Sequence, residues 1–206
     1  MDKRTRLPMS RSRKAEPRAK EYLCPCHPKF CHAVRSHAYN AFMTRLFSIL
    51  VTLSWGIWIG GLAGVTLSVI TLTRTFPPRT DPNFGLAALP VFAMFERVQL
   101  GLAAAALVFT FAWCLRPGAK RLRGVLFGLF ALGAVGAAVE AAYVAPKINE
   151  LREVRISRSA EFDRFHQMSE RIYGGTFLVL AGAGVLLPIA IAQDGRRDAS
   201  ERPATA

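Results

Sequence analysis

Residues that commonly bind metal ions gather near the start of this chain. Five thiol and imidazole side chains fall within nine residues: Cys24, Cys26, His27, Cys31 and His32. Such soft and borderline ligands are enough for a four-coordinate zinc or copper site. Zinc sites usually begin with cysteines at least two residues apart, whereas only Pro25 separates the first two here. The spacing favours a tail that holds no metal, with a zinc or copper site as the alternative.

A second polar group lies in or beside the apolar parts of the chain. Glu140 is the only acidic residue inside the long apolar runs, where an ionisable group needs a partner. At about 1.5 Å per helical residue, Arg97 reaches nearly the same depth, so we expect the two to meet. Either an ion-pair network or a site for a proton or small ligand fits this composition. The predicted polar pocket comprises Glu96, Arg97, Gln99, Glu140, Arg152, His166, Arg171 and Tyr173.

Catalytic chemistry has little support in the sequence. No nucleophile stands out with a general base beside it. His166 is the only histidine outside the first 42 residues, which disfavours a haem held by two histidines of one bundle. We therefore expect a protein without a cofactor that is not an enzyme, and we keep a membrane enzyme or redox subunit as an alternative.

The elements that must position these residues are four apolar stretches, 46–72, 98–115, 122–144 and 173–192. Each is close to the ~20 helical residues that cross a bilayer core. The chain is 51% hydrophobic, and its net charge of +13 is almost wholly excluded from these stretches. This segregation predicts an all-α fold: a four-helix transmembrane bundle, up-down-up-down, in which helices three and four extend beyond the bilayer as a hairpin.

The apolar stretches divide the chain into three parts. We predict a basic, disordered tail at 1–42, a four-span membrane domain at 43–193 and a disordered C-terminal tail at 194–206. The first tail suits anionic lipid headgroups, which attract a nearby cation by about 1 kcal/mol. It has no recognisable fold or aromatic platform for nucleic acid, so we expect no specific binding to DNA or RNA.

The distribution of Lys and Arg indicates how the spans are oriented. Eleven precede the first span, four lie between spans two and three, and three follow span four, against three and six in the other two loops. This excess places both termini in the cytoplasm, with the protein in the cell or inner membrane. A start at Met43 would remove most of that excess.

Small residues in the first span predict where helices approach closely. Gly56, Gly60 and Gly64 recur every four residues and share one helix face, with Gly61 beside them. Glycines at this spacing allow two backbones to come together. We expect the contact to be within the chain, because the other helices are tethered nearby, and keep a homo-oligomer as the alternative.

Four short motifs occur in an order that resembles a known family: Trp58-Ile59-Gly60-Gly61, Phe95-x-Arg97-x-x-x-Gly101, Pro146-x-Ile148-x-x-Leu151-Arg152 and Phe165-His166-x-Met168-Ser169. The chain resembles the transmembrane protein 205-like family, four-span proteins with a domain of unknown function of the 4149 type. The resemblance covers about residues 46–192 and leaves the cysteine-bearing tail outside. It implies an architecture rather than a reaction, with Gly60, Gly61, Arg97, Pro146, Arg152 and His166 at its motif positions.

These observations favour an integral membrane protein without a catalytic site. A small transporter or a membrane assembly subunit that uses the polar pocket fits best. Four spans without a broken helix pair leave little room for a complete pathway, so transport would call for several copies. A metal-handling protein that uses the N-terminal cysteines and histidines is the alternative from a different class.

Overall fold

The computed structural model describes residues 28–76, 83–153 and 160–200, and it forms five α-helices and one π-helical turn in these ranges. They are α1 (Pro28–Thr75), α2 (Asn83–Cys114), α3 (Lys120–Val139), η1 (Glu140–Val144), α4 (Ala145–Glu153) and α5 (Ala160–Ser200). Backbone contacts divide the chain into two units, Met1–Ser36 and His37–Ala206. The description below concerns the second unit.

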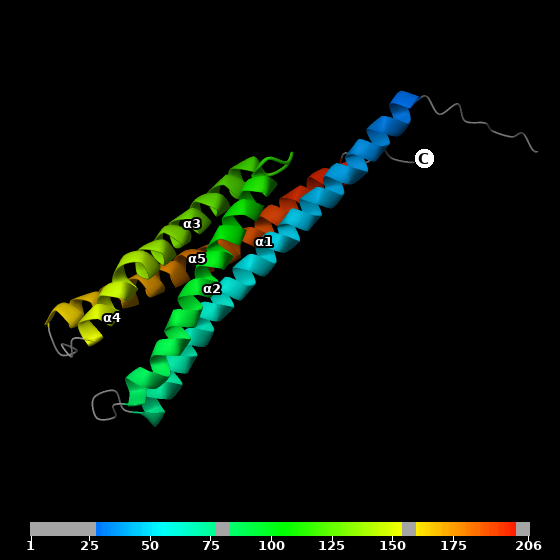
Figure 1. The fold of residues 1–206 in the computed structure, drawn as a ribbon. Helices are drawn as coiled ribbons and strands as arrows, with labels where there is room; N and C mark the ends of the chain where they lie inside the picture. The colour runs from blue at the N-terminus through cyan, green and yellow to red at the C-terminus, as the bar shows by residue number, and fades with distance from the viewer. Residues whose placement is uncertain (1–27, 77–82, 154–159, 201–206) are drawn as a thin grey trace, which may run out of the picture. The chain divides into compact units, whose positions relative to one another are not determined.

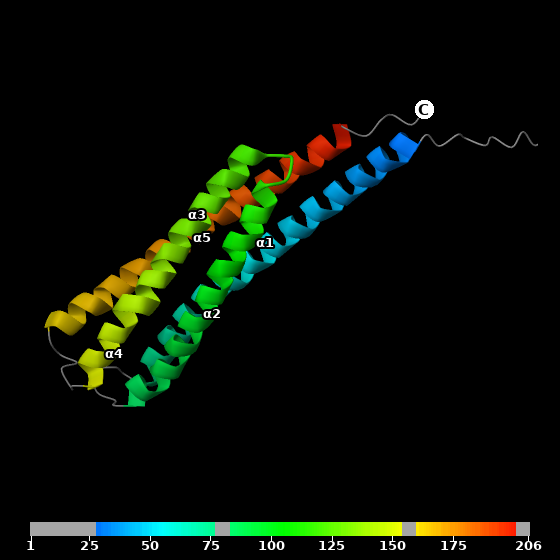
Figure 2. The same ribbon diagram turned by 45° about the horizontal axis from the view of Figure 1, so that its top comes forward.

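Four segments of the described chain are long and apolar enough to cross a membrane: Tyr39–Thr75, Ala87–Cys114, Lys120–Leu151 and Ala160–Arg197. Successive helices run in opposite directions, and the views in Figure 1 and Figure 2 both show α3 alongside α2 and alongside α5, the two helices against which it packs. The predicted all-α four-helix transmembrane bundle is confirmed. The protein is an integral membrane protein.

Helices three and four of the prediction continue beyond the length that a bilayer requires. The 20 residues of α3 rise about 30 Å, the thickness of a hydrocarbon core. The chain then continues through η1 and α4, which pack against the first turns of α5 (Figure 1). We call this the hairpin end of the bundle, and the opposite end, at the connection 115–119 between α2 and α3, the turn end.

Two helices extend past the bounds predicted for the membrane domain, residues 43–193. Helix α1 begins at Pro28, inside the segment predicted as a disordered tail. Helix α5 continues to Ser200, so the predicted boundary after residue 193 falls within a helix. Asp194, placed in the C-terminal tail by its polarity, is buried instead. Its charge has a partner in the bundle, and this allows the helix to continue past the apolar run.

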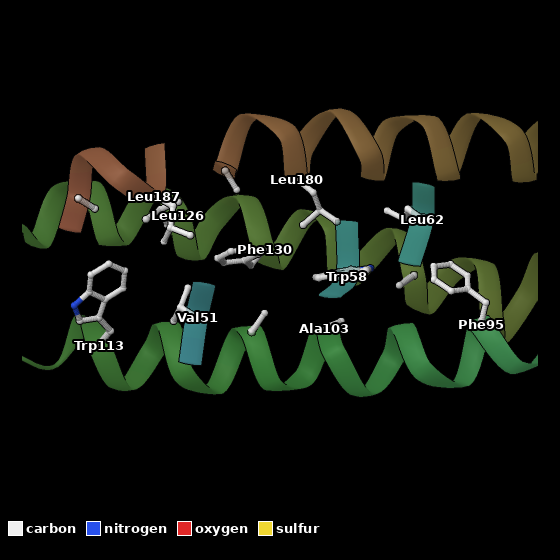
Figure 3. Packing of buried hydrophobic residues seen from close by; sticks show 14 residues of the cluster. Val51, Trp58, Leu62, Phe95, Ala103, Trp113, Leu126, Phe130, Leu180 and Leu187 are labelled. Carbon is white, nitrogen blue, oxygen red and sulfur yellow. The ribbon is translucent and has the colours of Figure 1, made fainter. Parts of the chain in front are cut away.

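The core runs along the whole bundle and takes residues from four helices (Figure 3). Trp58 of α1 and Phe130 of α3 are fully buried and lie between α5 and α2. On α1 the buried positions Val51, Trp58 and Leu62 follow helical spacing and form one stripe. Large side chains on that stripe determine which face of α1 meets the other helices.

The glycines predicted as a packing seam do not form one within the chain. A Cβ atom added at Gly56, Gly60 or Gly64 would meet nothing within 4 Å, whereas one at Gly61 would meet the Phe95 ring at 2.9 Å. The predicted intramolecular contact at the first three positions is wrong. They lie on the face of α1 opposite Trp58, because residues two or six positions away along a helix point elsewhere.

Close approach occurs where tryptophans of α1 meet glycines of other helices. Trp58 lies over Gly133 of α3, and the Trp55 ring fills the space where a Cβ of Gly184 would stand. Trp55 Nε1 also donates a hydrogen bond of 2.7 Å to the carbonyl oxygen of Leu180 in α5. Glycine thus serves the bundle by admitting indole rings rather than by letting two backbones touch.

Candidate polar site

Glu140 opens the π-helical turn between α3 and α4. Its carbonyl oxygen accepts the backbone N–H of Ala145, five residues later, and the helix widens there by one residue. Pro146 follows at once, and a proline has no N–H to donate and crowds the carbonyl four residues before it. The helix continues through η1 into α4 at this proline. Such turns are rare and often coincide with functional sites.

The Glu140 side chain is buried, with 2% of its surface exposed, and only one of its carboxylate oxygens has a partner. Ser169 Oγ on α5 donates a hydrogen bond of 2.6 Å to Glu140 Oε1. Glu140 Oε2 has no hydrogen-bond partner among the described residues. An unpartnered buried carboxylate oxygen is costly, so this atom is the strongest candidate for contact with a bound species.

Two further buried polar atoms at the hairpin end lack partners in the part of the chain that the structure describes. They are the side-chain oxygen of Gln99, a residue of α2 that is 1% exposed, and the hydroxyl of Tyr173 on α5. The Tyr173 ring packs against Phe92 and Phe95 of α2, with centroids 6.5 and 6.1 Å apart. Three different elements therefore bring unsatisfied oxygen atoms into the same end of the core.

Electrostatic interactions connect the titratable residues at this end of the bundle. Glu140 lies close enough to Glu96 and to Tyr173 for its charge to act on both, and His166 acts on Glu140 from α5. We define the polar site as Glu96, Gln99, Glu140, Ser169 and Tyr173. All of its potential ligands are oxygen atoms from carboxylate, amide, hydroxyl and phenol groups, which suit a proton or a hard cation.

The arginines of the predicted pocket lie elsewhere. Arg97 and Arg171 are both exposed, and neither makes a hydrogen bond or ion pair with a described residue. The expected contact between Arg97 and Glu140 is therefore not formed. Phe95 and Gln99 are the buried positions of α2 on either side of Arg97, and Arg97 lies between them on the opposite side of the helix. Equal depth was a sound estimate, but depth does not determine the side of a helix.

His166 and Arg152 complete the account of the predicted pocket. His166 is exposed, stacks on Phe162 with ring centroids 6.0 Å apart, and lies 3.5 Å from a carboxylate oxygen of Glu170. Arg152 belongs to α4, but its side chain is outside the described residues. Ser169 was not among the predicted site residues, although it closes the motif Phe165-His166-x-Met168-Ser169. Only its spacing from Tyr173, one helical turn, could have linked it to the site.

A second buried polar cluster, at the turn end, was not predicted. Arg123 is fully buried and pairs with Asp194 of α5, with 2.5 Å between Arg123 Nη2 and Asp194 Oδ2. Asp194 Oδ2 also accepts from Trp113 Nε1 at 3.1 Å, and Oδ1 accepts from the Ala119 backbone N–H at 3.0 Å. Both carboxylate oxygens are satisfied. We call Trp113, Arg123 and Asp194 the turn clamp.

The connection between α2 and α3 is shaped around this clamp. Arg123 Nη1 donates to the carbonyl oxygens of Trp113 and Arg116, at 2.7 and 2.9 Å. Gly118 has a φ of 146°, and a Cβ there would collide with the Arg123 guanidinium and the Asp194 carboxylate. The guanidinium lies over the Trp113 ring, 5.0 Å from its centroid. Arg123 was counted among the loop charges between spans two and three, whereas its side chain forms a buried ion pair with Asp194.

The metal ligands predicted in the first tail remain untested. Cys24, Cys26 and His27 lie outside the described residues, and only the backbone of Cys31 and His32 is described, within α1. Within the described residues there is no group of three or more His, Cys, Asp or Glu side chains that could hold a metal ion.

Comparison with known proteins gives one match. The family described as Domain of unknown function (DUF4149) matches residues 53–157, which include residues 53–75 of α1, all of α2, α3 and α4, and the π turn with Glu140. No curated protein matches the chain, and no solved structure does. The matched region ends before α5, so Ser169, Tyr173 and Asp194 lie beyond it.

Proposed function

Because this chain belongs to the DUF4149 family, whose description assigns no activity, we propose a function from the polar site: a small membrane transporter that binds a proton or hard monovalent cation at Glu140. The unpartnered, buried Glu140 Oε2 is the observation that carries the proposal. Ionisable residues inside membrane spans are rare because of their solvation cost, and they commonly mark ion pathways and proton relays.

The surroundings of Glu140 support cation binding over a purely structural role. A structural carboxylate would be expected to use both oxygens, as Asp194 does at the other end of the bundle. Around Glu140 the nearby groups add a second carboxylate, Glu96, and the Tyr173 hydroxyl, whose oxygen can accept as well as donate. A bound cation or proton would satisfy these atoms together.

The position of the site suits exchange with one side of the membrane. Counted from Lys120, Glu140 lies about 30 Å along the helix, near the far boundary of a hydrocarbon core. A species that reaches it from the hairpin end would cross little apolar material. Passage to the turn end would require movement of α1 or a neighbouring copy, because the core between the two ends is continuous.

Ion flux in proteoliposomes tests this function. We expect the purified full-length protein to dissipate an imposed Na⁺, K⁺ or H⁺ gradient, and Glu140→Gln to abolish that flux while leaving the fold intact. Glu170→Gln is the matched control, since it removes an exposed carboxylate from α5. Equal flux through wild type and Glu140→Gln would disprove the role of Glu140, and equal loss in both variants would point to a nonspecific charge effect.

A membrane assembly subunit is the second candidate, and the outward face of α1 favours it. Gly56, Gly60 and Gly64 share one face of α1, and a Cβ at any of them would meet no other described part of the chain within 4 Å. In helix interiors glycine is less favourable than alanine by roughly 0.5–1 kcal/mol, and close packing of a second copy would offset that.

Crosslinking in native membranes tests the homo-oligomer. In a chain whose native cysteines are replaced by serine, we expect Gly60→Cys to form a disulfide-linked dimer under mild oxidation. Leu178→Cys, at an exposed position of α5, is the matched control and should stay monomeric. Equal crosslinking at both positions would indicate random collision rather than an interface.

We propose further that both termini lie in the cytoplasm, as the Lys and Arg distribution indicates. Lys120 and Arg121 are exposed at the turn end and support this orientation. Arg123 does not, because Asp194 balances its charge. The tail cysteines and histidines, with anionic headgroups as partners of the basic tail, stay as proposals that intact mass and metal analysis of the native protein would test.

A further inference from the structure

A surface groove at the hairpin end is separate from the polar site. It has a volume of about 660 Å³ and lies between η1 with α4 on one side and the first turns of α5 on the other. Tyr143, Phe165 and Met168 form its apolar wall, and Lys147, Glu161 and Arg164 supply its charges. We call it the hairpin groove.

The groove combines an aromatic wall with charges of both signs. The rings of Tyr143 and Phe165 meet edge to face, with centroids 5.8 Å apart. Lys147 Nζ lies 2.9 Å from Glu150 Oε2, in a partly exposed pair that an incoming anion can replace at little cost. Arg164 is exposed and forms no hydrogen bond or ion pair with a described residue. Two cationic side chains are thus available in the groove.

Depth in the membrane indicates which molecules this groove meets. From Lys120, at the turn end, Tyr143 and Lys147 lie about 35 and 40 Å along the helix, at ~1.5 Å per residue. A bilayer with a hydrocarbon core of about 30 Å measures about 40–45 Å when its headgroup layers are included. Relative to Glu140, which lies at the far boundary of the hydrocarbon core, Tyr143 is about 5 Å and Lys147 about 10 Å farther out. The apolar wall therefore begins where acyl chains meet glycerol, and the charges lie at the outer side of the headgroups.

We propose that the hairpin groove binds a phospholipid with an ethanolamine headgroup. The lipid phosphate accepts hydrogen bonds from Lys147 and Arg164, while its glycerol and upper acyl chains pack against Tyr143, Phe165 and Met168. Glu161 acts on Lys147 electrostatically and lines the same groove, so it is placed to accept from the headgroup ammonium. A choline headgroup has no N–H to donate, and a glycerol headgroup has no positive charge.

Lipid titration in detergent tests the site on the full-length protein. Phosphatidylethanolamine, phosphatidylcholine or phosphatidylglycerol is added to dodecylmaltoside micelles, and retained lipid is counted by native mass spectrometry. We expect phosphatidylethanolamine to be retained preferentially by the wild type. In Lys147→Gln/Arg164→Gln its affinity should fall about 30-fold, as expected for two cation contacts of about 1 kcal/mol each.

Two controls separate this site from general charge effects and from free phosphate. Arg97→Gln/Arg171→Gln removes the same charge from exposed positions outside the groove and should retain the lipid. Soluble sn-glycero-3-phosphoethanolamine should fail to compete, because it lacks the acyl chains that the apolar wall holds. Equal loss in both double variants, or effective competition by the soluble compound, would overturn the proposal.

Headgroup preference provides a test that keeps both cations. Glu161→Gln should retain phospholipid but lose the preference for ethanolamine over glycerol. If the Lys147→Gln/Arg164→Gln protein fails to fold, a photoactivatable phosphatidylethanolamine on the wild type decides: adducts between Tyr143 and Met168 support the groove, and adducts confined to other helices overturn it. An unchanged headgroup preference in Glu161→Gln would overturn the assignment of ethanolamine.

Discussion

Asp194 and Glu140 are both buried acids in apolar helices, but they are held in opposite ways. At the turn end, both oxygens of Asp194 accept hydrogen bonds, and a buried arginine balances its charge. At the hairpin end, Glu140 has one hydroxyl donor and a second oxygen without a partner among the described residues. Asp194, with both oxygens hydrogen-bonded, stabilises the fold. Glu140 has an oxygen left to bind another species.

Removing Asp194 is expected to have the largest effect on stability. Asp194→Ala leaves Arg123 buried without its counter-charge, so we expect a loss of ~3–5 kcal/mol in the free energy of unfolding. Unfolding in mixed detergent micelles measures it. Glu150→Ala, which breaks an exposed pair, is the control and should lose less than ~1 kcal/mol. Similar losses in the two variants would refute the structural role of the turn clamp.

Gly118 tests the same clamp through the backbone. Gly118→Ala places a Cβ at positive φ against Arg123 and Asp194, so we expect a loss of about 1–3 kcal/mol in the same unfolding assay. Gly124→Ala is the matched control, since its Cβ would meet nothing within 4 Å in α3. That variant should be more stable than wild type by about 0.5–1 kcal/mol. If Gly118→Ala left the free energy of unfolding unchanged, the connection between α2 and α3 would be able to open and make room for the methyl group.

Glycines that admit tryptophan should behave differently from glycines in open space. Gly184→Ala pushes against the Trp55 ring and should cost about 1–3 kcal/mol of unfolding free energy, through overpacking. Gly182→Ala, two residues earlier in α5, meets nothing within 4 Å and should be neutral or stabilising. Thermal unfolding in detergent compares the pair. Equal effects would contradict the packing of α1 against α5.

Replacing Glu140 should affect function more than folding, in contrast to replacing Asp194. Glu140→Gln retains an oxygen that can accept from Ser169 and removes a buried charge, so we expect unfolding free energy to change by less than about 1 kcal/mol. Stabilisation of the protein by Na⁺ or K⁺ over choline should disappear in the variant. A loss of stability as large as that of Asp194→Ala would make Glu140 a scaffold residue too.

The smallest expected effect is the coupling between Arg97 and Glu140. Since they do not touch, the double variant Arg97→Ala/Glu140→Ala should lose the sum of the single losses within about 0.3–0.5 kcal/mol. The same cycle on Arg123 and Asp194 should deviate from additivity by about 0.5–3 kcal/mol. A strong coupling in the first pair would restore the ion pair that depth alone predicted.

The sequence pattern was enough to predict the membrane spans and to single out Glu140 as an acid within them. It was not enough to predict which side chains contact one another. Long apolar runs leave few alternatives to helices, and a single acid within them is conspicuous. Side-chain partners depend on rotation about each helix axis, and this is why Arg97 was paired incorrectly. The same error placed Gly56, Gly60 and Gly64 against the bundle together with Gly61, although only a Cβ at Gly61 would contact another helix. Asp194 was assigned to the C-terminal tail because it follows the last apolar run. Its burial depends on Arg123, a residue far away in the sequence, and no local pattern indicates that pairing.

The π turn at Glu140–Val144 sets the direction in which the hairpin end leaves the membrane-crossing part of α3. Such a turn is equivalent to one residue inserted in an α-helix, and one residue corresponds to about 100° of rotation about the axis. A single insertion or deletion there would re-aim Lys147 and the rest of α4 while leaving the membrane-crossing part of α3 unchanged. A chain with the same spans and a different length in this segment would therefore present its hairpin end in a different direction.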